Sequence, residues 1–137
     1  MNLDMYLEKH TAINGELSQL KTLAEKEIDE TAAARLSDHI NKLTAVLLMH
    51  LSSEDKYLYP ALLAAPDANV KTMTRQYMQE MGDISGKYSA FKTRYNTPSK
   101  ILSDPSGFKT ELAALYATVT ARIRKEESEL YQTAAKL

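Results

Sequence analysis

Apolar residues recur along the chain at intervals of three and four positions, which is the spacing of one face of an α-helix. Four such stripes occur, over residues 3–24, 36–58, 73–95 and 112–130. A helix of about 25 residues is about 37 Å long, so four of them account for most of the chain. The first two connections are short, which makes neighbouring helices antiparallel. The pattern predicts an all-α protein, an up-down-up-down antiparallel four-helix bundle in a single domain over residues 1–137.

Turn-forming residues divide the stripes from one another. Pro60 is expected to bend or end the second helix. Pro66, Asp67 and Asn69 mark the next turn and supply a capping residue for the third helix. The segment from Asn96 to Gly107 combines prolines, a glycine and small polar residues, and it is predicted to be the longest loop.

Five ionisable residues occupy stripe positions where a core-facing side chain should be apolar. They are His10, His50, Glu54, Arg122 and Glu126. An unpaired buried charge costs several kcal/mol, so these side chains need partners inside the protein. Antiparallel helices would bring His10, His50 and Arg122 to a similar height in the bundle. The polar residues are therefore predicted to converge on one spot in the core.

The spacing of these residues favours a metal site. His50 and Glu54 are four residues apart and project from one face of a helix, and Arg122 and Glu126 repeat that spacing. Two imidazoles and two carboxylates inside a bundle form a ligand set that suits iron, zinc or manganese. The His-x-x-x-Glu order differs from the Glu-x-x-His pairs of ferritin-like di-metal proteins, which disfavours a ferritin-like centre.

An internal repeat relates the second predicted helix to the fourth. The run HLSSEDKYLYP, which begins at His50, aligns with RIRKEESELYQ, which begins at Arg122. The matched pairs are Glu54 and Glu126, Asp55 and Glu127, Leu58 and Leu130, and Tyr59 and Tyr131. The two helices are interpreted as versions of one ligand-bearing element in which one histidine has been replaced.

These motifs resemble those of the hemerythrin-like (HHE cation-binding) domains over essentially the whole chain. The resemblance rests on His10, on the two aligned runs, and on Glu80-Met81, where the family usually has Glu-His. Members of that family are four-helix bundles that typically hold a di-iron centre for dioxygen binding, for iron or oxygen sensing, or for related redox roles. The resemblance therefore implies the same fold and a metal centre for this chain.

One of the two half-sites that the resemblance implies is complete. In the family, counterparts of His10 and His50 hold one metal, and those of Glu54 and Glu126 bridge to the other. These residues are called the first half-site below: His10, His50, Glu54 and Glu126. In the second half-site, Met81 and Arg122 stand where the family has histidines. A thioether is a poor ligand for iron in an oxygen-rich site, and a guanidinium cannot ligate at all.

The sequence therefore predicts a metal-binding domain with at most one metal ion and a sensor or binding role. Iron is the expected metal, with zinc or manganese as alternatives. In a second hypothesis no metal binds, and the polar residues form a hydrogen-bonded network in a structural or protein-interaction bundle. In a third, Tyr77, Glu80 or Asp55 replaces the missing ligands and two metals bind.

No enzymatic activity is expected. The chain has no cysteine, no serine on a recognisable nucleophile elbow and no Gly-rich phosphate loop. An oxidase-like activity would have to rest on two-iron chemistry, whose ligands are incomplete, so it is the least favoured hypothesis.

Other polar residues have simpler interpretations. His39 lies about 16 Å from His50 along the same helix and is expected to be a capping or half-buried histidine. Tyr59 and Tyr131 could form hydrogen bonds near the mouth of the site, but no feature of the sequence requires this. The charged run over residues 125–129 is expected to be mostly exposed to solvent.

Composition and charge narrow the range of expected binding partners. The 17 basic and 18 acidic residues leave a net charge of −1, and no block of like charge indicates nucleic acid or an anionic membrane surface. The longest aliphatic run, Ala45 to Met49, is far shorter than the about 20 residues that a membrane span needs. The first ten residues lack the pattern of a secretory signal, so a cytoplasmic location is expected. The metal ion is the one partner predicted.

Overall fold

The computed structural model describes all 137 residues, and every regular element in it is a helix. The all-α class predicted from the sequence is confirmed. In chain order the elements are α1 (Asp4–Ala24), α2 (Glu30–Ser53), the π-helical η1 (Glu54–Leu58), α3 (Tyr59–Leu63), α4 (Ala68–Tyr95), α5 (Pro98–Ser103), α6 (Pro105–Lys125), the π-helical η2 (Glu126–Leu130) and α7 (Tyr131–Ala135). None of these helices has both the length and the apolar character that crossing a membrane requires.

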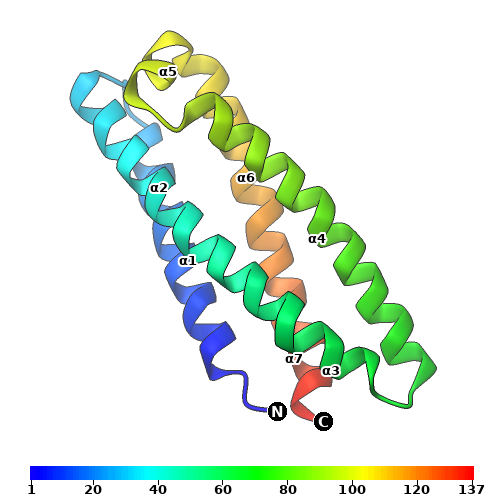
Figure 1. Cartoon of the computed structure of the whole chain (residues 1–137). Helices are drawn as coiled ribbons and strands as arrows, with labels where there is room; N and C mark the ends of the chain where they lie inside the picture. Colours follow the sequence, from blue (N-terminus) through cyan, green and yellow to red (C-terminus); the bar gives the residue numbers. More distant parts are fainter.

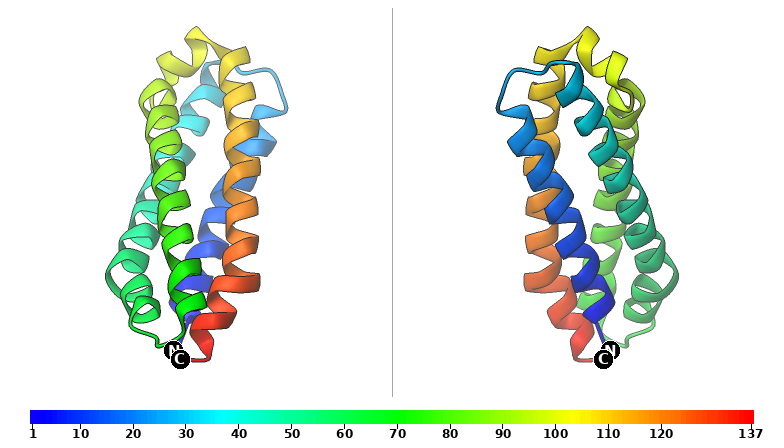
Figure 2. Two further views of the ribbon diagram at one scale, coloured as in Figure 1. Left: turned by 90° about the vertical axis from the view of Figure 1, so that its right-hand side faces the viewer. Right: turned by 90° about the vertical axis from the view of Figure 1, so that its left-hand side faces the viewer.

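The long helices α1, α2, α4 and α6 lie side by side in an elongated stack (Figure 1). Helix α1 packs against α2 and α6, and α4 packs against α6 and α2. Both chain termini lie at one end of the stack, and the short helix α5 lies at the other (Figure 2). Residues far apart in the sequence can therefore meet at the same height inside the stack.

The segment from Asn96 to Gly107, predicted to be a loop, is mostly helical. It contains the whole of α5 and the first residues of α6. The side chain of Thr97 accepts a hydrogen bond from the backbone N–H of Lys100, and that of Asp104 accepts one from the N–H of Gly107. A proline follows each of these two capping residues, at the first helical position, where its missing N–H costs nothing. The prolines that suggested a loop therefore start two helices.

The second helical rod does not end at Pro60, as the sequence analysis allowed. It continues through η1 and α3 to Leu63. In η1 the backbone N–H of Tyr59 bonds to the carbonyl of Glu54, five residues earlier. This wide turn restarts the α-helical pattern at Tyr59, so Pro60 falls in the first turn of α3, where a proline is tolerated.

The core consists of two apolar clusters. The larger one includes Leu17, Leu36 and Phe108. The smaller one lies near the chain termini and includes Leu58 and Leu130. The buried polar residues of the first half-site fall between these clusters along each helix. The two clusters therefore enclose a polar layer and shield it from water on both sides.

Candidate metal centre

The polar layer brings together the residues of the first half-site. His10 comes from α1, His50 from the end of α2, Glu54 from η1 and Glu126 from η2. His10 Nε2 lies 3.1 Å from His50 Nε2 and 2.8 Å from Glu126 Oε1, and His50 Nε2 lies 3.4 Å from Glu126 Oε1. Glu54 Oε1 lies 3.1 Å from His50 Nε2. All four side chains are at most 3% exposed.

The π-helical segments explain how the fold builds this layer. Glu54 opens η1 and Glu126 opens η2, so the repeat seen in the sequence recurs in the backbone. The N–H of Tyr59 bonds to the carbonyl of Glu54, and that of Tyr131 bonds to the carbonyl of Glu126. In an α-helix, residues five apart point about 140° away from each other. In a π-helical turn, which closes between residues five apart, they come onto one face, and such turns are frequent at functional sites.

Tyr131, for which the sequence allowed hydrogen bonds near the mouth of the site, is a member of the centre. Its hydroxyl lies 3.0 Å from His10 Nε2, 3.2 Å from Glu126 Oε1 and 3.3 Å from Glu54 Oε2. Its ring stacks on that of His10, with 5.1 Å between the ring centroids. The repeat pairs Tyr131 with Tyr59, but without the π-helical turn the spacing places both tyrosines on another face of the helix.

The second half-site is filled by the guanidinium of Arg122. Arg122 Nε donates to Glu126 Oε2 at 2.8 Å. Arg122 Nη2 donates to the hydroxyl of Tyr59 at 3.1 Å and to the carbonyl of Tyr77 at 3.0 Å. A longer contact of 3.4 Å reaches Glu80, which is itself half exposed. The arginine is thus held inside the protein with hydrogen bonds from all of its nitrogens.

Met81 is buried close to Arg122. The two residues line a cavity of about 20 Å³ together with His50 and Glu126. The residues considered as substitute ligands of a second metal either have other partners or are exposed to solvent. Tyr77 donates its hydroxyl to Glu129 and Glu80 pairs with Lys125, while Asp55 is exposed.

The imidazole of His10 also contacts a carboxylate through Nδ1, the ring nitrogen that faces away from the other residues of the first half-site. Glu127 Oε2 lies 3.0 Å from Nδ1 of His10, on the side of the ring away from His50. A carboxylate in this position fixes the tautomer in which Nε2 carries a lone pair for a metal. Glu127 belongs to the charged run predicted to be mostly exposed, and its side chain is 43% exposed even though it contacts His10. Glu126 in the same run is buried, and Glu129 accepts a hydrogen bond from Tyr77.

Charge is unevenly distributed in the layer. Burial alone would raise the pKa of Glu126, but hydrogen bonds from His10, His50 and Arg122 outweigh burial and hold its pKa well below the usual range. Burial lowers the pKa of His50, yet hydrogen bonds with Glu126 and Glu54 overcome it and raise the pKa to about 9. Glu54 has a raised pKa, chiefly because it is buried. The two carboxylates therefore favour the positively charged form of His50 inside the layer.

The donor atoms suit a metal ion. Imidazole nitrogen and carboxylate oxygen are ligands for iron, zinc and manganese. One ligand atom from each of His10, His50 and Glu126 lies within 4.8 Å of the other two, which is close enough for one ion to reach all three. Glu54 Oε1 is buried, and its one polar contact is with His50 Nε2 at 3.1 Å. A buried carboxylate oxygen held beside an imidazole nitrogen is consistent with a ligand that binds metal.

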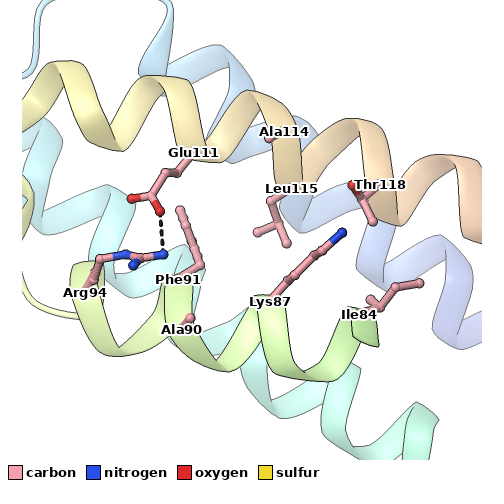
Figure 3. Close-up of a pocket in the computed structure, with 9 residues that line it drawn as sticks. All are labelled: Ile84, Lys87, Ala90, Phe91, Arg94, Glu111, Ala114, Leu115 and Thr118. Atoms are coloured by element: carbon pink, nitrogen blue, oxygen red, sulfur yellow. Dashed lines mark ion pairs between the residues drawn. The ribbon is translucent and has the colours of Figure 1, made fainter. Parts of the chain in front are cut away.

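His39 and the larger surface grooves lie outside this centre. His39 is half-buried and its Nδ1 lies 2.6 Å from Glu16 Oε2, so it has a partner of its own. A groove of about 310 Å³ between α4 and α6 is bridged at one end by the ion pair of Arg94 and Glu111 (Figure 3). Glu111 is its one carboxylate, and no histidine lines it. The groove therefore offers no ligand set for a metal.

Comparison with known proteins agrees with the geometry of the centre. A family model described as the hemerythrin HHE cation-binding domain matches residues 1–134. No curated protein and no solved structure gives a significant match to the chain. The matched region includes every residue of the polar layer and nearly the full chain. The protein therefore belongs to the hemerythrin HHE cation-binding domain family.

Proposed function

We propose that this protein binds one metal ion per chain, iron in the first place, through His10, His50, Glu54 and Glu126. The observation that carries the proposal is the approach of two imidazole nitrogens and a carboxylate oxygen to within 3.4 Å of one another in a buried layer. Zinc and manganese accept the same ligands and are the alternative ions.

The chain's own residues have separate tasks in this proposal. His10 and His50 supply neutral nitrogen ligands, and the two glutamates supply the negative charge that offsets a divalent cation. Arg122 supplies a fixed positive charge to Glu126 where the family places a second metal. A bound iron ion would add a redox-active Lewis acid to this layer. With one cation replaced by a guanidinium, a binding or sensing role is favoured over enzymatic turnover.

The proposed fold is an up-down-up-down four-helix bundle. It takes α2, η1 and α3 as one continuous helix and α6, η2 and α7 as another, because no connecting residue separates these elements. α1 and α4 are the remaining two long helices, and α5 is a short helical cap in the last connection. The position of both termini at one end supports this topology (Figure 2).

A metal-free structural bundle is the second candidate. It is favoured by the completeness of the hydrogen-bond network, since only His50 Nδ1 and Glu54 Oε1 are buried without a hydrogen-bond partner. The two candidates differ in whether protein prepared without a chelator holds metal.

Metal stoichiometry tests the proposal. Protein incubated with ferrous iron or zinc and then passed through gel filtration should hold one tightly bound ion per chain by elemental analysis. His50→Ala and Glu54→Ala should each abolish this binding, because each removes a buried ligand. His39→Ala is the matched control and should keep the ion, since His39 pairs with Glu16 outside the centre. Wild-type protein without metal after loading would favour the structural bundle, and two ions per chain would contradict the single half-site.

Glu127 gives a second, finer prediction. Glu127→Gln should weaken metal binding by about 10–100-fold, because the carboxylate that orients the His10 ring is lost. The helical content should stay unchanged, since the side chain of Glu127 is 43% exposed. Competition with a chelator measures the affinity, and Glu129→Gln serves as the control from the same run. Equal affinities for Glu127→Gln and the wild type would show that Glu127 does not position His10.

A further inference from the structure

We propose that the phenol oxygen of Tyr131 is a direct ligand of the metal ion, and this inference rests on the proposed metal-binding function. Neither the sequence motif nor the family match assigns a ligand role to this residue. The inference comes from the position of its hydroxyl group, which is in contact with all the residues of the first half-site.

Four donor atoms form a closed tetrahedron. They are His10 Nε2, His50 Nε2, Glu126 Oε1 and the hydroxyl oxygen of Tyr131. The three edges that do not involve Tyr131 measure 3.1, 2.8 and 3.4 Å. The three edges that meet at Tyr131 measure 3.0, 3.5 and 3.2 Å. The centre of a tetrahedron of this size lies about 2 Å from each corner, which is the usual distance from zinc or iron to a nitrogen or oxygen ligand.

Tyr131 closes this tetrahedron more evenly than Glu54 does. Glu54 approaches the group from one side, with Oε1 at 3.1 Å from His50 Nε2 and Oε2 at 3.3 Å from the Tyr131 hydroxyl. No hydrogen bond or ion pair links Glu54 to His10. Glu54 is therefore placed as an additional ligand at the edge of the site, and Tyr131 occupies the fourth corner.

The internal repeat contains a second tyrosine, Tyr59, that is not placed to bind the metal ion. Tyr59 holds the same position in η1 and α3 that Tyr131 holds in η2 and α7. Its hydroxyl faces the second half-site, where it accepts a hydrogen bond from Arg122 at 3.1 Å. The two tyrosines thus face two half-sites, one with imidazoles and one with a guanidinium. Only Tyr131 has ligand partners beside it.

Coordination by Tyr131 is a simple exchange of a proton for a metal ion. The O–H bond of the phenol breaks, the oxygen–metal bond forms, and the proton leaves to solvent without any change of oxidation state. Phenolate is a known ligand of ferric iron in proteins. A ferric ion in this site should therefore show a phenolate-to-iron charge-transfer band in the visible spectrum, which histidine and carboxylate ligands do not produce.

The experiment loads the protein with ferric citrate, removes unbound iron by gel filtration, and records iron content and visible spectrum together. Wild type should bind iron and show the band. Tyr131→Phe should lose the band and bind iron at least about tenfold more weakly. Tyr59→Phe, the repeat-related variant, should keep the band. Tyr88→Phe is the matched control for loss of a buried hydroxyl, since Tyr88 bonds to Thr44 away from the centre.

Zinc provides a second readout that needs no visible band. Zinc binding to the wild type at neutral pH should produce the ultraviolet difference spectrum of one ionised tyrosine per bound ion. In the same titration, Tyr131→Phe should bind zinc without producing that difference spectrum. Circular dichroism of each variant checks that the helices are intact.

The outcomes separate this inference from the proposed function. Iron bound by the wild type without a visible band, or a band that persists in Tyr131→Phe, would overturn the role of Tyr131 and leave metal binding in place. A wild-type protein that binds neither iron nor zinc would overturn both. Should Tyr131→Phe fail to fold, the wild-type band and its persistence in Tyr59→Phe still decide the question.

Discussion

Replacement of Arg122 by alanine should destabilise the metal-free protein by about 3–5 kcal/mol, which is the usual cost of removing one partner of a buried ion pair. The guanidinium donates to Glu126, to Tyr59 and to the backbone carbonyl of Tyr77. Without it, the buried carboxylate of Glu126 keeps the two histidines and the hydroxyl of Tyr131 as partners. Urea unfolding followed by circular dichroism measures the change in the free energy of unfolding.

Arg124→Ala is the matched control for this experiment. Arg124 lies two residues further along α6 and is exposed to solvent. Its removal should change the free energy of unfolding by no more than about 0.5 kcal/mol. Arg122→Lys should give an intermediate loss, because an ammonium retains the charge but not the planar set of donors. Equal stabilities for Arg122→Ala and Arg124→Ala would show that Arg122 does not support the polar layer.

The helices and most of the polar layer were predictable from residue spacing. Apolar positions at intervals of three and four reveal which face of each helix is buried, and the ionisable residues on those faces must then find partners in the core. Glu126 and His50 could be identified in this way because they break an otherwise apolar stripe. Arg122 could be identified by the same argument, and the structure places it in contact with Glu126.

The π-helical turns could not be predicted from that spacing. Periodicity assumes a constant angle of about 100° per residue, and a turn that closes over five residues breaks the assumption. Residues after the turn are therefore assigned to the wrong face, and this is why no feature of the sequence required Tyr59 and Tyr131 to form hydrogen bonds in the site. The repeated Glu-x-x-x-x-Tyr spacing in both runs was the one clue in the sequence.

One error and one contact that was not predicted have local physical causes. The segment around Ile101 was assigned to a loop because proline is usually read as a helix breaker, yet Pro98 and Pro105 stand directly after capping residues. The contact of Glu127 with the centre was not predicted, because its neighbours in the sequence are charged and its side chain is 43% exposed. Its partner, His10, is on α1 at the other end of the chain, and local sequence carries no information about such a contact.

Membership of the hemerythrin HHE family and the presence of Met81 and Arg122 where the family usually has histidines have a common explanation in the structure. In this chain two similar helical segments, η1 and η2, each begin with a buried glutamate that faces the same layer. A cation is needed beside each glutamate to offset its buried charge. In this chain Arg122 meets that need on one side without a metal ion, because its guanidinium lies 2.8 Å from Glu126. On the other side, His10 and His50 remain as the ligands of the proposed ion.

Restoring the missing histidines should convert the single site into a double one. In Met81→His combined with Arg122→His, the two new imidazoles would stand beside the cavity that Met81 and Arg122 now line with His50 and Glu126. Removal of the guanidinium also frees Glu126 Oε2, which now accepts a hydrogen bond from Arg122, to serve as a ligand of the second ion. Elemental analysis after loading with ferrous iron should show the metal content rising from one ion per chain towards two.

The two single variants test separately the two reasons why the second half-site is expected to hold no metal ion. Met81→His should still bind one ion, because the guanidinium of Arg122 remains in the second half-site and repels a second cation. Arg122→His should also bind one, because the thioether of Met81 is a poor partner for iron. Only the double variant supplies both imidazoles and removes the competing charge. If it too holds a single ion while its helices remain intact, then the second half-site lacks more than two histidines, and the alignment of Arg122 with His50 does not identify a metal position.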